Sequence, residues 1–209
     1  MNKGWSNDKK YILTTSNNKK LLLRVSDKTA YDDKKTIFEK LKQAAALNLN
    51  TPHPVDFGLC DDEESVYLLL TWVEGDDALS VLPNMSSSQQ YLLGNKVAEV
   101  LLKLHGLPVP EDIEPWGSWF RREEVQDRID FYNDNVRSHE GDLLVKYLLD
   151  NQDLLNNRPI AFMHGDCNIG NVIVTPDFEI GLIDFCSDYG DPWWEFDQAL
   201  GGTNRLRHL

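Results

Sequence analysis

The sequence has few cysteines and no long run of apolar residues. Its three cysteines, Cys60, Cys167 and Cys186, are widely spaced and form no Cys-x-x-Cys pair. This pattern argues against both a disulfide framework and a structural zinc site, and we expect free thiols. No stretch approaches the roughly 18 apolar residues of a transmembrane helix, and residues 1–13 lack the apolar core of a secretory signal. These absences predict a globular, cytoplasmic protein without a membrane partner.

Basic residues are too few for a nucleic-acid-binding protein. The 21 Lys and Arg residues stand against 34 Asp and Glu residues, which gives a formal net charge of −13 at pH 7. Because binding to a phosphate backbone needs clustered Lys and Arg, nucleic acid is not expected as a partner. An acidic surface suits a cationic small molecule, but an acidic excess also serves solubility alone.

The first part of the chain has the pattern of a small sheet. Residues 9–26 contain two short β-type runs separated by the turn sequence SNN, which predicts a hairpin. Residues 31–49 follow, with apolar side chains at helical spacing behind acidic residues, which predicts an amphipathic helix. Residues 65–75, SVYLLLTWVEG, predict a buried strand that ends in a loop. The order is strand, strand, helix, strand.

After residue 75 the sequence becomes mainly helical. Residues 86–107 place four apolar side chains on one helix face behind a serine cap, and residues 123–156 continue the helical pattern. A second hairpin is predicted near the end by the runs NVIVT and EIGLIDF, which flank the turn sequence PDF. We therefore expect an α+β fold with a small antiparallel-sheet lobe in residues 1–74 and a larger, mainly helical lobe in residues 75–209.

A polar cluster precedes this second hairpin, in the sequence FMHGDCNIGNVIV. Asp166 and Asn171 lie in one loop, and the hairpin can fold Asp184, at the end of its second strand, back beside Asn171. Mg²⁺ prefers oxygen ligands, commonly one or two protein side chains completed by substrate phosphates and water. Asn171 and Asp184 fit that role, which leaves Asp166 as a base.

The order of these residues resembles a known kinase pattern. Protein kinases carry H-R-D-x-x-x-x-N in the catalytic loop and a later D-F-G aspartate on the metal. This chain has H-G-D-x-x-x-x-N and D-F-C, with Gly165 and Cys186 at the differing positions, followed by GDPWWEF. It thus resembles the phosphotransferase family of aminoglycoside and choline-type kinases, which has a protein-kinase-like two-lobe fold. The resemblance implies Mg²⁺-dependent transfer of the γ-phosphoryl group of ATP or GTP to a hydroxyl, with Asp166 as base and Asn171 and Asp184 on the metal.

The same resemblance assigns nucleotide contacts in the first half of the chain. GWSNDKKYIL resembles the turn that covers the phosphates, with Ser6 available to phosphate oxygens. Arg24 has the strand position of the kinase lysine and Glu39 the helix position of its glutamate partner, so we expect these two side chains to pair and to position the triphosphate. The inter-lobe hinge falls on LLLTWVEGDD, where main-chain atoms of Thr71 and Val73 would pair with the adenine edge.

Several residues beside the motif are expected to be structural. His164 braces the loop, Asp191 and Glu195 match family positions that do the same, and a histidine at a helix end, His105, is given no catalytic role. Asn168 has no predicted role.

Two hypotheses of function stay open. The chain ends at Leu209, before the helices with which similar enzymes complete the acceptor pocket, so we expect a fold truncated at its C-terminus. Trp193, Trp194 and Phe196 would then form an exposed apolar patch. The first hypothesis is a kinase for a small, possibly amino-bearing acceptor such as an aminoglycoside. The second is a nucleotide-binding remnant or pseudokinase. The sequence predicts neither the acceptor nor the oligomeric state.

Overall fold

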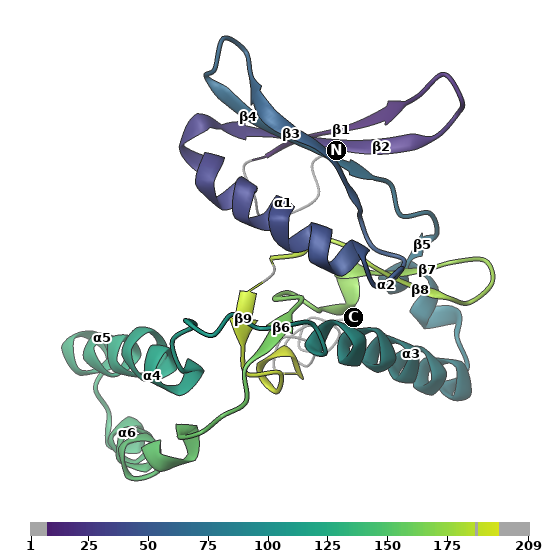
Figure 1. Cartoon of the computed structure of the whole chain (residues 1–209). Coiled ribbons are helices and arrows are strands. Elements are labelled where there is room, and N and C mark those ends of the chain that lie inside the picture. Colours follow the sequence, from purple (N-terminus) through teal and green to yellow (C-terminus); the bar gives the residue numbers. More distant parts are fainter. Residues whose placement is uncertain (1–7, 187, 197–209) are drawn as a thin grey trace.

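Two lobes of different composition make up the chain, and the computed structural model describes residues 8–186 and 188–196 of it (Figure 1). The small lobe contains a four-stranded antiparallel sheet in the order β1-β2-β4-β3, with helix α1 across one face. The hairpin expected over residues 9–26 is confirmed as β1 and β2. The elements are β1 (Lys9–Thr14), β2 (Lys20–Asp27), the 3-10 turn η1 (Lys28–Ala30), α1 (Tyr31–Ala45), β3 (Pro54–Cys60) and β4 (Ser65–Thr71).

Strand β4 lies at the centre of the small-lobe core because alternate side chains point to the same face. Val66, Leu68 and Leu70 are almost completely buried, whereas the residues between them are half-buried. On α1, Leu41 and Ala44 are buried in the same core as Leu68 and Leu70. The strand predicted over residues 65–75 is thus confirmed, with its end at Thr71.

Strand β3 is absent from the sequence-based expectation. Pro54 begins it and Gly58 lies within it, and both residue types are poor strand formers. β3 tolerates them because it lies at the sheet edge and pairs with β4 alone. Gly58 also leaves room for a neighbouring ring, since a Cβ atom there would lie 3.1 Å from a ring carbon of Tyr67.

Helices dominate the larger lobe, as expected. The helix predicted over residues 86–107 is α3, whose first turn is closed by a capping box at Ser86. The helical pattern over residues 123–156 corresponds to α5, α6 and the turns beside them. None of the helices in the described part of the chain is long and apolar enough to cross a membrane. The elements are α2 (Ala78–Val81), η2 (Leu82–Asn84), α3 (Ser87–His105), α4 (Trp116–Phe120), the π-helical turn η3 (Arg121–Gln126), α5 (Asp127–Asn135), α6 (His139–Asp150) and η4 (Gln152–Leu155).

Short strands in the larger lobe carry the polar motif. The second hairpin is confirmed as β7 (Val172–Val174) and β8 (Ile180–Leu182), and β5 (Asp76–Asp77) extends it in the order β5-β7-β8. β6 (Ala161–Met163) pairs antiparallel with β9 (Asp188–Gly190). The Cys186 N–H donates to the His164 carbonyl, and the Ile183 carbonyl accepts a hydrogen bond from the His164 ring; these bonds join the loops that follow β6 and β8. The two loops of the motif therefore lie side by side.

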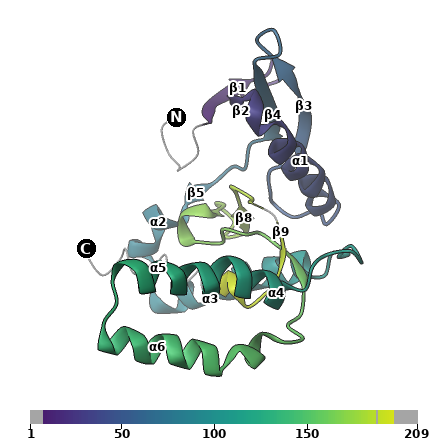
Figure 2. The ribbon, with the colours of Figure 1, turned by 90° about the vertical axis from the view of Figure 1, so that its left-hand side faces the viewer.

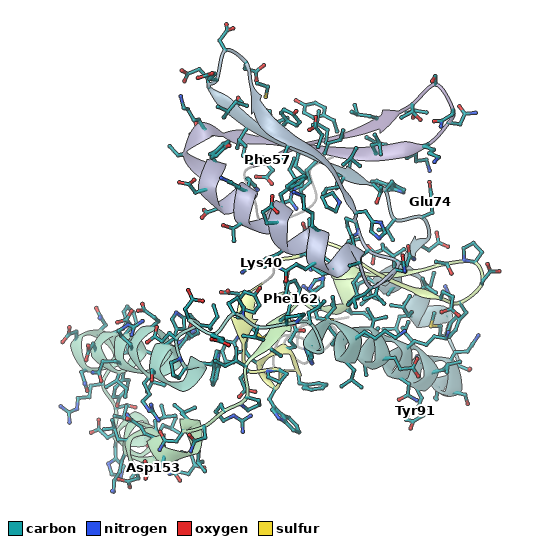
Figure 3. All side chains as sticks on the ribbon, in the orientation of Figure 1. Lys40, Phe57, Glu74, Tyr91, Asp153 and Phe162 are labelled. Carbon is teal, nitrogen blue, oxygen red and sulfur yellow. The ribbon has the colours of Figure 1, made fainter. Side chains whose placement is uncertain are left out.

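The side chain of Lys40 joins the lobes from the underside of α1, where Figure 3 labels it. Its Nζ atom lies 3.1 Å from a carboxylate oxygen of Asp188. The same atom lies 5.0 Å from the centre of the Tyr189 ring, within the range of a cation–π contact. These contacts fix α1 against β9.

Apolar side chains remain exposed on the larger lobe. Helix α6 lies beside α5 at the lower edge of the molecule in both ribbon views (Figures 1 and 2), and none of its residues is buried. On α3, Tyr91 points away from the ribbon and is 74% exposed (Figure 3). The exposed apolar side chains of α5 and α6 are Phe131, Leu143, Leu144, Tyr147, Leu148 and Leu149.

The aromatic patch expected at residues 193–196 is only partly exposed. Trp193 and Phe196 are exposed, in agreement with the prediction. Trp194 is not, because its ring packs against Trp116 at a centroid distance of 6.0 Å and edge-on against Phe120 at 5.1 Å. The expectation for Trp194 is therefore wrong, and its role is to hold α4 against the end of the motif.

Candidate active site

The carboxylate of Asp166 is fixed by two amide side chains of its own loop. Asn168 Nδ2 donates to Asp166 Oδ1 at 2.7 Å, and Asn171 Nδ2 donates to Asp166 Oδ2 at 2.8 Å. Asn168 Oδ1 in turn accepts the N–H of Gly170 at 2.9 Å, which caps the 3-10 turn η5 (Ile169–Asn171). Asn168, which the sequence left without a role, thus positions the predicted base. Its signal was an Asn two residues before a glycine, a common side-chain cap.

His164 is fully buried beneath this loop and braces it, as expected. Its Nδ1 atom accepts the backbone N–H of Asp166 at 3.2 Å, so its Nε2 atom carries the proton and donates to the Ile183 carbonyl at 3.0 Å. Burial lowers the pKa of this imidazole below its ordinary value, which outweighs the opposing charge of Glu195. A neutral ring therefore links the loop of Asp166 to the strand end before Asp184.

Glu195 provides a second brace from the end of the motif. Its carboxylate is buried and accepts the backbone N–H of Gly165 at 2.7 Å, that of His164 at 3.2 Å, and the ring of His105 at 3.1 Å. Burial would raise its pKa, but these hydrogen bonds hold the pKa below its ordinary value. Gly165 has φ +85°, a left-handed conformation that favours glycine, which explains glycine at the position of the kinase arginine.

Asp191 and His105 are structural, as the sequence indicated. Asp191 is 2% exposed; it accepts the N–H of Trp193 at 3.0 Å and pairs with the guanidinium of Arg158. His105 reaches only the buried Glu195 among the described residues. Neither side chain is directed by these contacts toward Asp166.

Asp184 lies beside Asn171, as the hairpin argument predicted. The Ile183 N–H donates to the Asn171 carbonyl at 3.0 Å, and Asp184 follows directly with a left-handed φ of +61°. This conformation is uncommon outside glycine but is tolerated best by Asn and Asp. The turn directs the Asp184 carboxylate to the small lobe, where Oδ1 meets Arg24 at 2.7 Å and Oδ2 lies 3.6 Å from Lys10 Nζ.

The oxygen atoms of Asn171 and Asp184 fit a magnesium ion. Asn171 uses its Nδ2 atom on Asp166, and no described residue donates to its Oδ1 atom. The Asp184 side chain is 35% exposed. Within residues 8–186 and 188–196, no cluster of three or more His, Cys, Asp or Glu could hold a metal by itself. One amide oxygen and one carboxylate match the incomplete protein shell of Mg²⁺, to which water and substrate phosphates are added.

The expected pairing of Arg24 with Glu39 is wrong. Glu39 is exposed and pairs with Lys42 one turn further along α1, at 2.8 Å. Arg24 instead binds Asp8, through Nε at 2.8 Å and the second terminal nitrogen at 2.7 Å, as well as Asp184. Arg24 itself lies on β2 facing the larger lobe, where a phosphate-binding cation is expected.

The hinge residues differ in the use of their main-chain groups. The Thr71 N–H donates to the His53 carbonyl at 2.9 Å, so this N–H is not available for an adenine contact. The main-chain N–H and C=O of Val73 have no hydrogen-bond partner in the described part of the chain. Val73 therefore has the open main-chain groups that a hinge contact needs. Ser6 and the glycine turn lie outside the described residues.

All three cysteines are free thiols, as expected. Burial raises the pKa of Cys167 to about 12, and the charges of Glu195 and Asp166 act in the same direction. Burial also raises the pKa of Cys186, with the charges of Asp166 and Asp184 adding to it. Both thiols beside the motif are thus protonated and weakly nucleophilic.

A family model places the chain among known proteins. The model described as the phosphotransferase enzyme family matches residues 1–206. The chain belongs to this family. No curated protein sequence matches this phosphotransferase, so its relatives are identified by the family model and by structure.

Solved structures share the fold of this phosphotransferase at low sequence identity. The aminoglycoside phosphotransferase APH(3'')-Id from Streptomyces rimosus, in complex with ADP and streptomycin, is 17% identical, with a TM-score of 0.63 over 97% of this chain and 79% of that chain. The choline kinase LicA from Streptococcus pneumoniae is 18% identical, with a TM-score of 0.58 over 97% and 68% of the two chains. The amicoumacin kinase hAmiN, with AMP-PNP and Ca²⁺, is 13% identical, with a TM-score of 0.64 over 96% and 62%. These likenesses confirm the expected protein-kinase-like fold.

Proposed function

We propose that this phosphotransferase transfers the γ-phosphoryl group of ATP or GTP to a hydroxyl group of a small, amino-bearing acceptor such as an aminoglycoside. The observation that carries the proposal is the geometry around Asp166. Two amides of one loop hold its carboxylate, and one of these amides, Asn171, lies beside Asp184. A positioned carboxylate next to an amide and carboxylate oxygen pair is the arrangement that phosphoryl transfer uses.

Asp166 acts on the acceptor hydroxyl. Its oxygen atoms are held in place by Asn168 and Asn171 before any acceptor arrives. The carboxylate orients the hydroxyl and receives its proton as the hydroxyl oxygen bonds to the γ-phosphorus and the bond to the leaving nucleoside diphosphate breaks. Because the loop is already fixed, little reorganisation is needed at the moment of transfer.

Nucleotide binding falls to residues of both lobes. Asn171 Oδ1 and the Asp184 carboxylate would hold Mg²⁺, which when bound neutralises charge on the phosphate oxygens. Arg24, on the facing strand, contacts the triphosphate with its guanidinium. Val73 pairs with the adenine edge through its main chain, with the Thr71 carbonyl beside it. Ser6, which lies outside the described residues, would contact the phosphates.

The nature of the acceptor rests on charge. Structures with this fold include an aminoglycoside phosphotransferase bound to streptomycin and a choline kinase, and streptomycin and choline are both cationic or amino-bearing compounds. The net charge of −13 on this chain is compatible with such an acceptor. An amino-bearing alcohol is therefore the first class to test.

Two measurements test the proposal. Thermal unfolding is followed with ATP or GTP, with and without Mg²⁺, and nucleotide consumption is then measured over aminoglycosides, choline, amino sugars and macrolides. We expect stabilisation by the Mg²⁺ complex and consumption with at least one amino-bearing acceptor. Asp166→Asn should abolish consumption while nucleotide still stabilises the fold, whereas the exposed Asp177→Asn should behave like wild type.

The competing hypothesis, a nucleotide-binding remnant, gives a different result. Nucleotide would then raise the melting temperature while no acceptor caused consumption, and Asp166→Asn would change neither quantity. Equal consumption by wild type and Asp166→Asn would remove Asp166 as the base.

A further inference from the structure

Asp8, the residue before β1, is the centre of a buried charge cluster between the sheet and α1. Its Oδ2 atom accepts hydrogen bonds from Arg24 Nε at 2.8 Å and from Lys34 Nζ at 2.6 Å, and lies 2.7 Å from a terminal nitrogen of Arg24. Its Oδ1 atom accepts the Ser26 hydroxyl at 2.7 Å. The side chains of Asp8, Arg24 and Lys34 are only 7%, 13% and 10% exposed.

Helix α1 is therefore linked to Arg24 on β2 through the Asp8 carboxylate. In the expected arrangement a helix glutamate would pair with Arg24, but Glu39 faces solvent. The helix instead contributes a cation, Lys34, which occupies the buried side of α1 together with Leu41 and Ala44. Two buried cations repel each other unless a carboxylate lies between them, and Asp8 is that carboxylate.

The contacts also determine which edge of the guanidinium faces the larger lobe. Asp8 holds Nε and one terminal nitrogen of Arg24, and the other terminal nitrogen lies 2.7 Å from Asp184. A guanidinium is planar, so fixing one edge fixes the direction of the other. With Asp8 in place, Arg24 presents a defined N–H edge to the space where the phosphates and the metal meet Asp184.

We propose that Asp8, bridged to α1 by Lys34, is the positioning residue that holds Arg24 for the nucleotide phosphates, in the place expected for Glu39. This inference rests on the proposed function. Loss of the Asp8 carboxylate removes the contact that holds the Nε edge of Arg24, so that the guanidinium can rotate toward Asp184 and compete with the metal for the Asp184 carboxylate. A purely structural cluster would leave the metal requirement unchanged.

The test measures nucleotide binding without any acceptor, so it does not depend on knowing the acceptor. Titration calorimetry with a non-hydrolysable ATP analogue gives the affinity at several Mg²⁺ concentrations. We expect Asp8→Asn to weaken binding by about tenfold or more and to raise the Mg²⁺ concentration needed for half-maximal binding. Glu39→Gln separates the two arrangements and should bind like wild type, as should Asp33→Asn, a matched acid on the exposed face of α1.

A double substitution distinguishes an effect of Asp8 through Arg24 from a general loss of folding. If Asp8 acts through Arg24, then Asp8→Asn should weaken binding little further in an Arg24→Gln background, while thermal melts report the folded fraction of each variant. The proposal would be overturned by unchanged nucleotide affinity in Asp8→Asn or by a loss of affinity in Glu39→Gln. It would also be overturned if the losses of binding free energy in Asp8→Asn and Arg24→Gln were fully additive in the double variant. Absence of binding by wild type would overturn the proposed function, and this inference with it.

Discussion

His164 and Asp166 are joined by a hydrogen bond in which the backbone N–H of Asp166 donates to Nδ1 of the imidazole, at 3.2 Å. The opposite ring nitrogen donates to the carbonyl of Ile183, directly before Asp184. One neutral, fully buried ring thus determines the distance between the loop of the base and the residue proposed for the metal.

Replacing this ring should damage both stability and turnover. His164→Leu leaves the N–H of Asp166 and the carbonyl of Ile183 without their partner, and we expect a loss of about 2–4 kcal/mol in the free energy of unfolding. Turnover should fall further than the folded fraction explains. Urea unfolding and steady-state kinetics measure the two effects, with the exposed His139→Leu as control. Wild-type stability in His164→Leu would contradict the bracing role.

Asn168→Ala tests whether the loop amide positions the base. The substitution removes the donor to Asp166 Oδ1 and the cap of Gly170, so the carboxylate gains freedom. We expect kcat to fall by about 10- to 100-fold, with the KM for nucleotide changed little, because misplacement of a reacting group slows transfer more than binding. Asn133→Ala, on the exposed face of α5, is the matched control. A raised nucleotide KM at constant kcat would assign Asn168 to binding instead.

Glu195→Gln should destabilise the fold although the two side chains have nearly the same shape. The carboxylate now accepts from Gly165, His164 and His105, whereas an amide has one accepting oxygen and one donating nitrogen. At least one buried N–H then faces a donor, at a cost of about 1–3 kcal/mol. Chemical denaturation at pH 7 measures this loss, and the exposed Glu111→Gln should show none.

Asp8 should make stability depend on acid pH. Burial acts to raise its pKa, but hydrogen bonds from Lys34 and Ser26 and the charge of Arg24 lower the pKa from 3.8 to about 2. The folded state thus favours the ionised form, so the stabilisation is present above pH 3.8 and is lost as the pH falls toward 2. We expect about 2 kcal/mol. The difference between wild type and Asp8→Asn in urea unfolding from pH 5 to pH 2 measures it, and a constant difference across that range would contradict it.

The sequence predicts the site best where position along the chain determines position in space. Asp166 and Asn171 share a loop, and the short hairpin must return Asp184 to that loop, so their proximity follows from the motif. The sequence predicts the Arg24 contacts poorly, because these depend on which side chains of α1 lie on its buried face. Lys34 occupies the buried stripe with Leu41, while Glu39 lies off it, and the spacing of apolar residues in the sequence already contained that difference.

Two further features depend on tertiary context. β3 begins with Pro54 and contains Gly58, residues that weaken any local strand signal; its edge position tolerates them, and it forms by pairing with β4. Asp8 precedes the first strand in a polar stretch, where a carboxylate normally faces solvent. Its burial follows from two cations that approach from β2 and α1, and no local pattern indicates that.

The contact between Arg24 and Asp184 has a consequence for which ligands the site accepts. The two side chains neutralise each other across the lobes at 2.7 Å. A free phosphate compound that bound Arg24 would draw the guanidinium away from Asp184, which would keep only the more distant Lys10 among its described cations. A free divalent cation that bound Asp184 would remove one of the two carboxylates that contact Arg24, the other being Asp8. The metal–nucleotide complex brings both charges at once, so each protein group exchanges one partner for another. We expect the site to bind the complete metal–nucleotide complex in preference to either component alone.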